Sequence, residues 1–482
     1  MLNHFNFKRI DNNCILVTND FGLHRFLSAS EFKALATNQV TPGSALYEQL
    51  HQGLFLLEPM ELYSGEIAAD LREMKNYVFT STSLHIFVVT NACNLQCIYC
   101  QAQASKERKT GMMSIEVGTR AIDIALQSPS QMLTFEFQGG EPLVNFSTIK
   151  AMVEYAEEHK GDKRIEYTIV SNLTLATDEI LDFLISHNFS ISTSLDGPKD
   201  LHDCNRRFVG RGSSYDYVIA GARKIQEKGY SVSAIQTTTR YSLTRAKDIV
   251  NEYLRMGTAG VFLRPLTPLG FAKADWELIG YSPKEFIAFY KDAFSEILRI
   301  NKSGIRFPEQ HATYFLKKIL HGHAYNYMEL RSPCGAGVGQ MAYYYDGKIY
   351  TCDEGRMVAE AGDDAFCLGN VYADNYETLI NSDTCKVTCA SSVLETIPGC
   401  CDCVYHPYCG VCPVVNYAMD GDIFARQAHG YRCKVYAGIL DHIFSLLREN
   451  DEEIMRILYS WIEDGCYENC KEGEIHGCGE SI

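Results

Sequence analysis

The sequence has no long apolar runs. Of its 482 residues, 46% are hydrophobic, yet the longest apolar stretches, such as Leu84 to Val89, have the length of a strand. A helix that spans a bilayer needs about 18 consecutive apolar residues, so we expect no membrane partner. The first residues, Met1 to Ile10, also lack a basic segment followed by an apolar core. No secretion signal is therefore expected, and the protein is expected to be cytoplasmic.

Basic residues are fewer than acidic ones. The chain has 44 Lys and Arg against 60 Asp and Glu, which gives a formal net charge of −16. Such an excess of negative charge repels the phosphates of nucleic acids and anionic lipids. We therefore expect no nucleic-acid partner, whereas a basic peptide would suit this charge.

Cysteine, in contrast, is abundant, with 19 residues. Disulfides are rare in a reducing cytoplasm, so these thiols need another explanation. Three of them lie between Cys93 and Cys100, and seven lie between Cys385 and Cys412. Clustered thiolates in a reducing compartment indicate zinc or iron–sulfur centres.

Residues 1–65 are expected to form a small leading unit. The pattern predicts a hairpin of strands Cys14–Thr18 and Leu23–Leu27, followed by helices up to Ala36 and over Ala45–Gly53. This order resembles a winged-helix unit of the kind that precedes peptide-modifying enzymes, which would hold a leader peptide as an added edge strand. A purely structural cap is the alternative. Residues 66–83 are expected to be a connector.

From Leu84 onward, β-rich runs alternate with amphipathic helical segments six times. The predicted strands are Leu84–Thr90, Met132–Phe137, Ile165–Val170, Phe189–Ser194, Ser231–Thr239 and Val261–Arg264, and the helices between them are Ser114–Gln127, Phe146–His159, Asp178–Ser186, Tyr215–Lys228 and Thr244–Met256. This alternation predicts an α/β fold with parallel strands and right-handed crossovers. We expect a partial (β/α)6 barrel over residues 84–309, with its chemistry at the C-terminal ends of the strands.

The first predicted strand is followed by Cys93-Asn94-Leu95-Gln96-Cys97-Ile98-Tyr99-Cys100. Three thiolates with this CxxxCxxC spacing can hold three irons of a cubane cluster and leave the fourth iron open for a ligand. Zinc bound by three cysteines and water is the alternative, although structural zinc sites usually have two CxxC pairs, which this stretch lacks. The spacing therefore favours a [4Fe–4S] cluster.

The position of this motif resembles that of the radical S-adenosylmethionine (SAM) enzymes. The resemblance implies that the open iron binds the methionine part of SAM, and that reduction of SAM yields a 5′-deoxyadenosyl radical. It also implies that Gly139, Gly140 and Glu141, within a GGEP element, hold the cofactor's amino group through backbone and carboxylate. Tyr99 takes the place of the aromatic residue beside the last cysteine of the motif, and Asn172 and Ser194 would contact the ribose of SAM. Arg206, or alternatively Arg207, would bind the carboxylate of SAM, and Leu263 would lie under the adenine.

Beyond residue 310 the alternation stops, and a separate loop-rich region held by metal centres is expected over 310–440. Its cysteines resemble the SPASM extension, which implies two auxiliary [4Fe–4S] clusters. The resemblance assigns Cys400, Cys403, Cys409 and Cys433 to a distal cluster, and Cys334, Cys352 and Cys412 to a nearer one. The nearer cluster either has an open position or recruits Cys389. The remaining thiols, Cys14, Cys204, Cys367, Cys385 and Cys401, are expected to be small buried hydrophobes.

Two parts of the C-terminal half complete the expectations. Asp353 directly follows Cys352, and by the same resemblance it accepts a proton from the substrate; a helix cap or a solvated acid is the alternative. Residues 441–482 are expected to form a helix and then a tail with Cys466, Cys470 and Cys478, to which we assign no role.

Longer stretches, among them Glu136–Pro142, Phe262–Leu266 and Pro407–Gly410, are similar to the His-Xaa-Ser system radical SAM maturases. This similarity implies an oxidoreductase that cross-links a side chain of a ribosomally made precursor peptide, recognised through residues 1–65. Reduced flavodoxin or ferredoxin would be the electron donor. The alternatives are a sulfatase-maturase-type enzyme that forms formylglycine, and a non-catalytic iron–sulfur electron carrier or peptide-binding scaffold.

Overall fold

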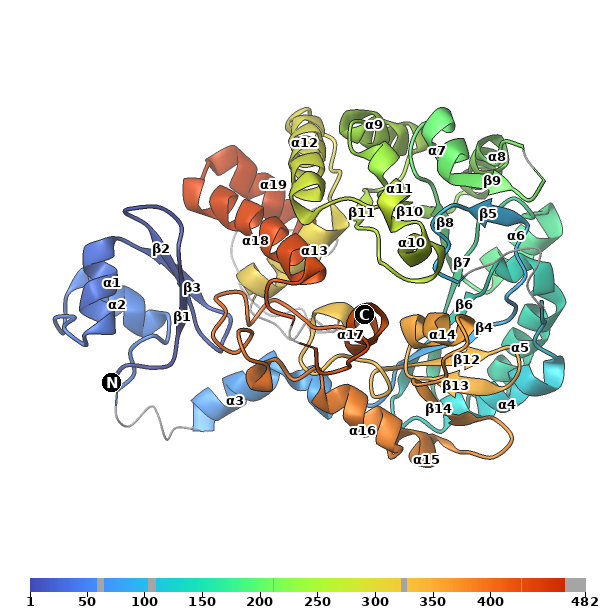
Figure 1. The fold of residues 1–482 in the computed structure, drawn as a ribbon, viewed down its shortest axis with the longest axis horizontal. Coiled ribbons are helices and arrows are strands. Elements are labelled where there is room, and N and C mark those ends of the chain that lie inside the picture. Colours follow the sequence, from blue (N-terminus) through green and yellow to red (C-terminus); the bar gives the residue numbers. More distant parts are fainter. Residues whose placement is uncertain (59–64, 103–109, 211, 322–326, 426, 464–482) are drawn as a thin grey trace.

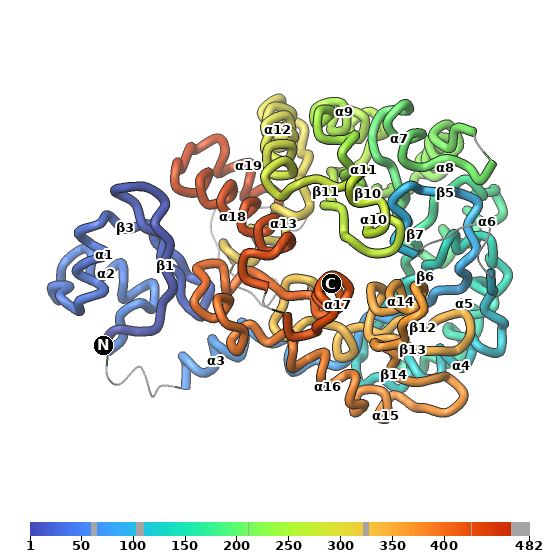
Figure 2. Tube along the Cα trace, viewed as in Figure 1, coloured from blue at the N-terminus to red at the C-terminus, as the bar shows by residue number. Residues whose placement is uncertain are grey.

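The computed structural model describes residues 1–58, 65–102, 110–210, 212–321, 327–425 and 427–463. The tail cysteines Cys466, Cys470 and Cys478 lie outside these ranges. Figures 1 and 2 show an elongated molecule with a small N-terminal unit at one end and the barrel at the other. No helix in the described ranges is both long and apolar enough to cross a membrane.

The N-terminal unit is a three-stranded antiparallel sheet covered by two helices. Its strands β1 (Asn6–Arg9), β2 (Ile15–Thr18) and β3 (His24–Leu27) pair in that order. Helix α1 (Ala29–Ala36) begins at the capping box of Ser28 and Glu31, and α2 (Ala45–Gln52) begins at Ser44. The predicted hairpin and both helices are confirmed, and β1 is an additional strand that the sequence analysis did not include. The connector forms α3 (Gly65–Met74) and the short 3-10 helix η2 (Asn76–Phe79).

The six predicted parallel strands are present. They are β4 (Leu84–Val88), β6 (Met132–Gln138), β7 (Arg164–Val170), β8 (Ser190–Ser194), β10 (Ser233–Thr237) and β11 (Phe262–Arg264), and each pairs in parallel with the next. The helices between them are α4 (Ile115–Leu126), η3 (Pro142–Asn145), α5 (Phe146–His159), α6 (Asp178–Ser186), α7 (Lys199–Asn205), α8 (Tyr215–Glu227), η4 (Arg240–Ser242) and α9 (Ala246–Met256). The expected alternation of strand and helix is confirmed. The face of the sheet that carries Phe87, Phe135 and Phe137 packs in the hydrophobic core, where these three side chains are completely buried.

The sheet does not end where the loop-rich region was expected to begin. Strand β12 (Gln340–Tyr344) pairs in parallel with β4, and β13 (Lys348–Tyr350) and β14 (Cys367–Asn370) extend the same sheet in antiparallel fashion. The expectation of a separate region after residue 310 is therefore corrected. The physical reason is that β12 is buried along its whole length and completes the sheet next to β4.

Helices make up most of the remaining chain. Beside the barrel these are α10 (Gly270–Ala274), α11 (Trp276–Ile279), α12 (Pro283–Lys302), α13 (Gln310–Leu316), the π-helical turn η5 (Lys317–His321) and η6 (Met328–Leu330). The C-terminal part has α14 (Asp353–Glu360), α15 (Tyr376–Ile380), α16 (Asp383–Ala390), η7 (Leu394–Thr396), α17 (Pro413–Asp420), α18 (Tyr431–Glu449) and α19 (Glu452–Ile462). Helices α18 and α19 pack on α12 and share the barrel's hydrophobic core.

Candidate functional site

The CxxxCxxC loop lies at the C-terminal end of β4 and is fastened to the GGEP turn. The amide of Gly140 donates to the carbonyl of Thr90 at 2.9 Å, and the amide of Glu141 donates to that of Ala92 at 2.9 Å. A Cβ atom on Gly139 or Gly140 would come within 2.3 Å of these same carbonyl oxygens. The two glycines are therefore required by the close approach of the two loops.

A two-stranded ribbon holds the other side of the loop. Strand β5 (Leu95–Cys97) pairs with β9 (Arg206–Phe208), which sets Cys97 opposite Arg206. Burial is the main cause that raises the pKa of Cys97 to about 12, with Cys100 adding to it and Arg206 opposing it. Burial and the thiols of Cys97 and Cys100 likewise hold the pKa of Cys93 well above its usual range.

Thiols with raised pKa values, such as those of Cys93 and Cys97, ionise readily only when a cation compensates their charge. Together with Cys100 they form a donor set that fits an iron–sulfur cluster. In the described ranges no three His, Cys, Asp or Glu side chains converge closely enough for a single metal ion. A cubane cluster spreads its ligands over separate irons and does not need such convergence.

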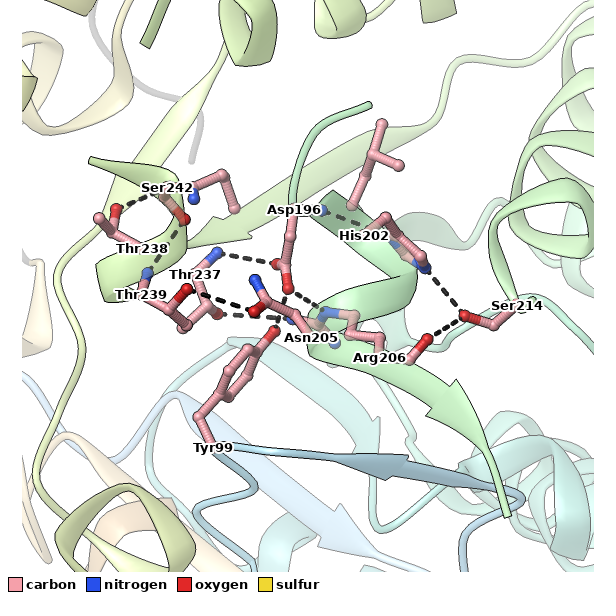
Figure 3. A network of polar contacts seen from close by, with 12 residues as sticks. Tyr99, Asp196, His202, Asn205, Arg206, Ser214, Thr237, Thr238, Thr239 and Ser242 are labelled. Carbon is pink, nitrogen blue, oxygen red and sulfur yellow. Dashed lines mark hydrogen bonds and ion pairs between the residues drawn. The ribbon is translucent and has the colours of Figure 1, made fainter. Parts of the chain in front are cut away.

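Tyr99 and Arg206 meet at a buried carboxylate, as Figure 3 shows. The Tyr99 hydroxyl donates to Asp196 at 2.7 Å, and Arg206 Nε lies 3.1 Å from the same oxygen of Asp196. The amide of Thr237 donates to the other oxygen at 3.2 Å, and Arg206 Nη2 donates to the Thr237 hydroxyl at 3.4 Å. The guanidinium, expected to pair with the cofactor carboxylate, is thus already paired with Asp196, which is completely buried.

Asp196 is a site residue that the sequence analysis did not select. Its position in Leu195-Asp196-Gly197, directly after strand β8, is a signal that could have identified it, because polar residues at strand ends gather at the barrel rim.

Glu141 and Asn172 also make different contacts from those expected. The Glu141 carboxylate accepts hydrogen bonds from the Ser171 hydroxyl (2.7 Å) and from the amides of Asn172 (2.8 Å) and Leu143 (3.0 Å). Burial raises the pKa of Glu141 to about 7. The Asn172 side chain donates to Asn94 at 2.9 Å, within the thiol loop. Both side chains thus brace the loop.

The two faces of the sheet separate Ser194 from Leu263. Ser194 is partly exposed, and its face also presents Thr237 and Arg264, since strand neighbours in register share a face. Leu263 belongs to the opposite face and is completely buried in the hydrophobic core. Ser194 therefore lines the barrel interior, whereas the side chain of Leu263 lies on the opposite face of the sheet, and its contact with adenine stays a prediction.

The four thiols assigned to the distal cluster come together. Cys400, Cys403, Cys409 and Cys433 line one cavity, together with His406 and Arg432. Burial, followed by the proximity of Cys433 and Cys403, raises the pKa of Cys400 to about 11. Burial and the other three thiols raise the pKa of Cys409 to about 12. The arrangement fits the donor set of a second cluster.

The three thiols assigned to the nearer cluster also come together, in a small core of their own. Burial, then Glu354 and the thiols of Cys412 and Cys334, hold the pKa of Cys352 well above its usual range. Cys352 caps α14, and Cys412 directly precedes α17. Cys389, in contrast, lies one turn from Cys385 on α16, and its thiol interacts with Cys385 and Arg331. Arg331 also interacts with Cys334, so Cys389 stays a predicted fourth ligand of this set.

Comparison with known proteins identifies the barrel. Residues 87–247 match the profile of the radical SAM superfamily. This part of the chain is a radical SAM domain. Superfamily membership implies a [4Fe–4S] cluster that binds SAM, and the thiol loop and the Gly139–Gly140 turn both lie within the matched residues.

The radical SAM domain and its C-terminal extension are similar in sequence to anaerobic sulfatase-maturating enzymes. The chain is 23% identical over 393 residues to the serine-type anaerobic sulfatase-maturating enzyme of Bacteroides thetaiotaomicron, covering 75% of this chain and 89% of that one. It is 24% identical over 384 residues to the cysteine-type enzyme of Clostridium perfringens (strain ATCC 13124), covering 76% and 97%.

Two solved structures share the fold. The structure of anSMEcpe with bound AdoMet has a TM-score of 0.65 at 22% identity and covers 76% of this chain and 98% of its own. SuiB of Streptococcus suis bound to S-adenosylmethionine has a TM-score of 0.55 at 16% identity and covers 90% and 100%.

Two carboxylates adjoin the radical SAM domain's interior next to Cys352. Asp353, the expected proton acceptor, is ion-paired with Arg356, whose Nε lies 3.1 Å from it, and Arg356 is 1% exposed. Glu354 was missed by the sequence analysis. Burial, followed by the charges of Glu329 and Asp353, raises the pKa of Glu354 and so favours its neutral form.

Proposed function

We propose that this chain is a radical SAM enzyme that oxidatively modifies, by cross-linking, a side chain of a ribosomally made peptide, which it recognises through residues 1–65. The observation that carries the peptide substrate is the N-terminal sheet. In the described part of the chain no further strand pairs with β1 or β3, so both edges can accept a peptide strand. Streptococcus suis SuiB, whose structure bound to the precursor peptide SuiA has been solved, supports this substrate class, since that structure covers 88% of this chain at a TM-score of 0.52.

The chain's own groups supply the setting for the reaction. Cys93, Cys97 and Cys100 would hold the cluster, and the backbone of Gly139 and Gly140 would hold SAM. With cluster and SAM bound, one-electron reduction supplies a carbon radical that removes hydrogen from an unreactive C–H bond. The Tyr99–Asp196–Arg206 network keeps the thiol loop in position, and Asp353 or Glu354 takes up the proton that the substrate loses.

The activity is tested by co-expression with a candidate precursor peptide, encoded by any short open reading frame found next to this gene, followed by mass spectrometry of the peptide. We expect a loss of two hydrogens with the wild-type chain and no change with Cys97→Ala. An unmodified peptide in the wild-type experiment, together with active SAM cleavage, would contradict the cross-link.

Recognition of the peptide is tested separately by hydrogen exchange of the full chain with and without the candidate leader. We expect slower amide exchange in β1 or β3, because an added strand pairs with the edge amides. Unchanged exchange in both strands, at a leader concentration that saturates binding, would rule out this mode of recognition.

Formation of formylglycine is the second candidate, supported by the sulfatase-maturating relatives. A Cys- or Ser-containing sulfatase peptide without a leader distinguishes the two functions: an aldehyde product supports the second candidate. A non-catalytic electron carrier predicts neither product and no 5′-deoxyadenosine when SAM and reductant are supplied.

We propose in addition that the two C-terminal thiol sets hold auxiliary [4Fe–4S] clusters that remove the surplus electron. Three cubane clusters predict about 12 irons per chain. Anaerobically reconstituted protein with about four irons would leave only the SAM-binding cluster.

A further inference from the structure

An arginine lies between the two C-terminal thiol sets. Arg432 is the second residue of α18 and directly precedes Cys433. It lines the cavity of the four distal thiols, and it also lines a second cavity that is bounded by Arg264 and Glu329 at the end of strand β11. Its side chain is only 16% exposed. Arg432 thus lies beside the cavity of the distal thiols and also borders the barrel side of the molecule.

Two arginines share the single carboxylate of Glu329. Arg432 Nη2 donates to one Glu329 oxygen at 3.0 Å, and Arg264 Nη2 donates to the other at 2.8 Å. The hydroxyl of Tyr436 adds a hydrogen bond at 3.1 Å, and the Arg432 guanidinium lies 4.8 Å from the ring centre of Tyr436. One negative charge cannot neutralise two positive ones, so this group keeps a net positive charge.

The positive charge faces the thiols. Arg432 is the charged group that counteracts the effect of burial on the pKa of Cys412, and it acts in the same sense on Cys334. Glu354 acts on the same thiols in the opposite sense. The Nε atom of Arg432 is buried and has no hydrogen-bond partner among the described residues. A buried donor without a partner is costly, unless a group that the protein binds accepts its hydrogen bond.

We propose that Arg432 is a positioning residue that stabilises the reduced state of the auxiliary clusters, through its charge and through the spare Nε donor. A nearby positive charge favours the more negative, reduced cluster and so raises the reduction potential. Glu329 opposes this effect, because it withdraws part of the positive charge. The inference depends on the auxiliary clusters of the proposed function.

The test is a redox titration of the full-length, iron-loaded enzyme, followed by electron paramagnetic resonance. The signals of the auxiliary clusters are those that remain in a variant without Cys93, Cys97 and Cys100. At a fixed solution potential, we expect the ratio of reduced to oxidised auxiliary cluster to fall about tenfold in Arg432→Met. We expect it to rise in Glu329→Gln and to lie between Arg432→Met and wild type in Arg432→Lys.

The ratio of reduced to oxidised cluster is expected to fall in Arg432→Met and to rise in Glu329→Gln. Structural damage would instead move the ratio in the same direction in both variants. The matched control is Arg448→Met on the same helix, since Arg448 is 40% exposed and pairs with Asp11 on the surface. Ratios within about twofold of wild type in all three variants, at full iron content, would overturn the inference. If Arg432→Met loses iron, the ratios of reduced to oxidised cluster in Arg432→Lys and Glu329→Gln decide whether the inference holds. About four irons in the wild-type chain would instead refute the auxiliary clusters themselves, and the inference with them.

Discussion

The three-thiol loop of the barrel and the C-terminal thiol sets are assembled in different ways. The barrel loop takes all its thiols from eight consecutive residues, Cys93 to Cys100, between a strand and a short ribbon. The C-terminal sets take theirs from residues 334 to 433, and several of these thiols lie at helix starts. A local site depends on its own loop, whereas a dispersed site depends on the fold around it, and on the metal that joins its parts.

Removal of one thiol from the Cys93–Cys100 loop tests whether this site works independently of the C-terminal thiol sets. Cys97→Ala is expected to abolish formation of 5′-deoxyadenosine, by a factor of at least about 1,000, because the cluster loses one of its three ligands. The auxiliary iron is expected to remain. Chromatography of the nucleoside product and an iron assay on the same sample check both statements. Cys204→Ala, at a thiol that we expect only to pack, is the matched control. Equal nucleoside yields in Cys97→Ala and wild type would contradict the assignment of the loop.

Metal removal should affect the two regions unequally. After chelation under anaerobic conditions, we expect residues 394–425 and 427–433 to lose more protection from amide exchange than the barrel strands do, because metal would join thiols that are far apart in the sequence. Strands β4 to β11 are expected to keep theirs, since their hydrogen bonds and core are independent of metal. Hydrogen exchange measured before and after chelation provides the comparison. Equal loss in both regions would mean that the barrel also depends on its cluster for stability.

The loop that carries the distal thiols is also supported by the N-terminal sheet. The buried Thr18 hydroxyl on β2 donates to the carbonyl of Val404 at 2.7 Å. Thr18→Val leaves that carbonyl without its donor and is expected to cost about 2 kcal/mol. The readout is the denaturation midpoint of iron-loaded protein, with exposed Thr119→Val as control. An unchanged midpoint would show that the N-terminal sheet does not stabilise the loop.

A smaller effect concerns pH. The carboxyl of Glu309 accepts hydrogen bonds from Tyr290 (2.5 Å) and from the amide of Ala312 (2.7 Å), and burial raises its pKa to about 7. A raised pKa means that the stabilisation is complete below the unfolded pKa of about 4.3, and is lost as pH rises through about 7. Between pH 6 and pH 8, wild type is expected to lose about 1 kcal/mol relative to Glu309→Gln. Parallel denaturation midpoints across this range would argue against the shift.

The local sequence pattern predicted the barrel and the three-thiol loop, but not the contacts between residues that are far apart in the sequence. The strands from β4 to β11 were predictable because each alternates with an amphipathic helix, and the thiol loop because its spacing is complete within eight residues. Strand β12 was not, since its five residues carry no hint that they pair with β4. The ion pair of Arg206 with Asp196 likewise depends on how a turn brings two residues ten positions apart together.

The C-terminal sites show the same limit. The resemblance named the seven thiols that the fold gathers, because their spacing is itself part of the pattern. Cys389 was the weakest of the thiol predictions because nothing in its own neighbourhood distinguishes a ligand from a packed thiol. Its proximity to Cys385 follows from the turn of α16, which is visible only in the structure.

The parallel ladder between β4 and β12 has a mechanical consequence. Strand β4 leads into the Cys93 loop, while β12 and β13 lead directly to Cys352, so one hydrogen-bonded sheet carries thiols of both regions. A hinge between the two centres would have to break that ladder. A motion that admits a substrate is therefore expected at other joints of the molecule, with the Cys93 loop and Cys352 moving together as one body.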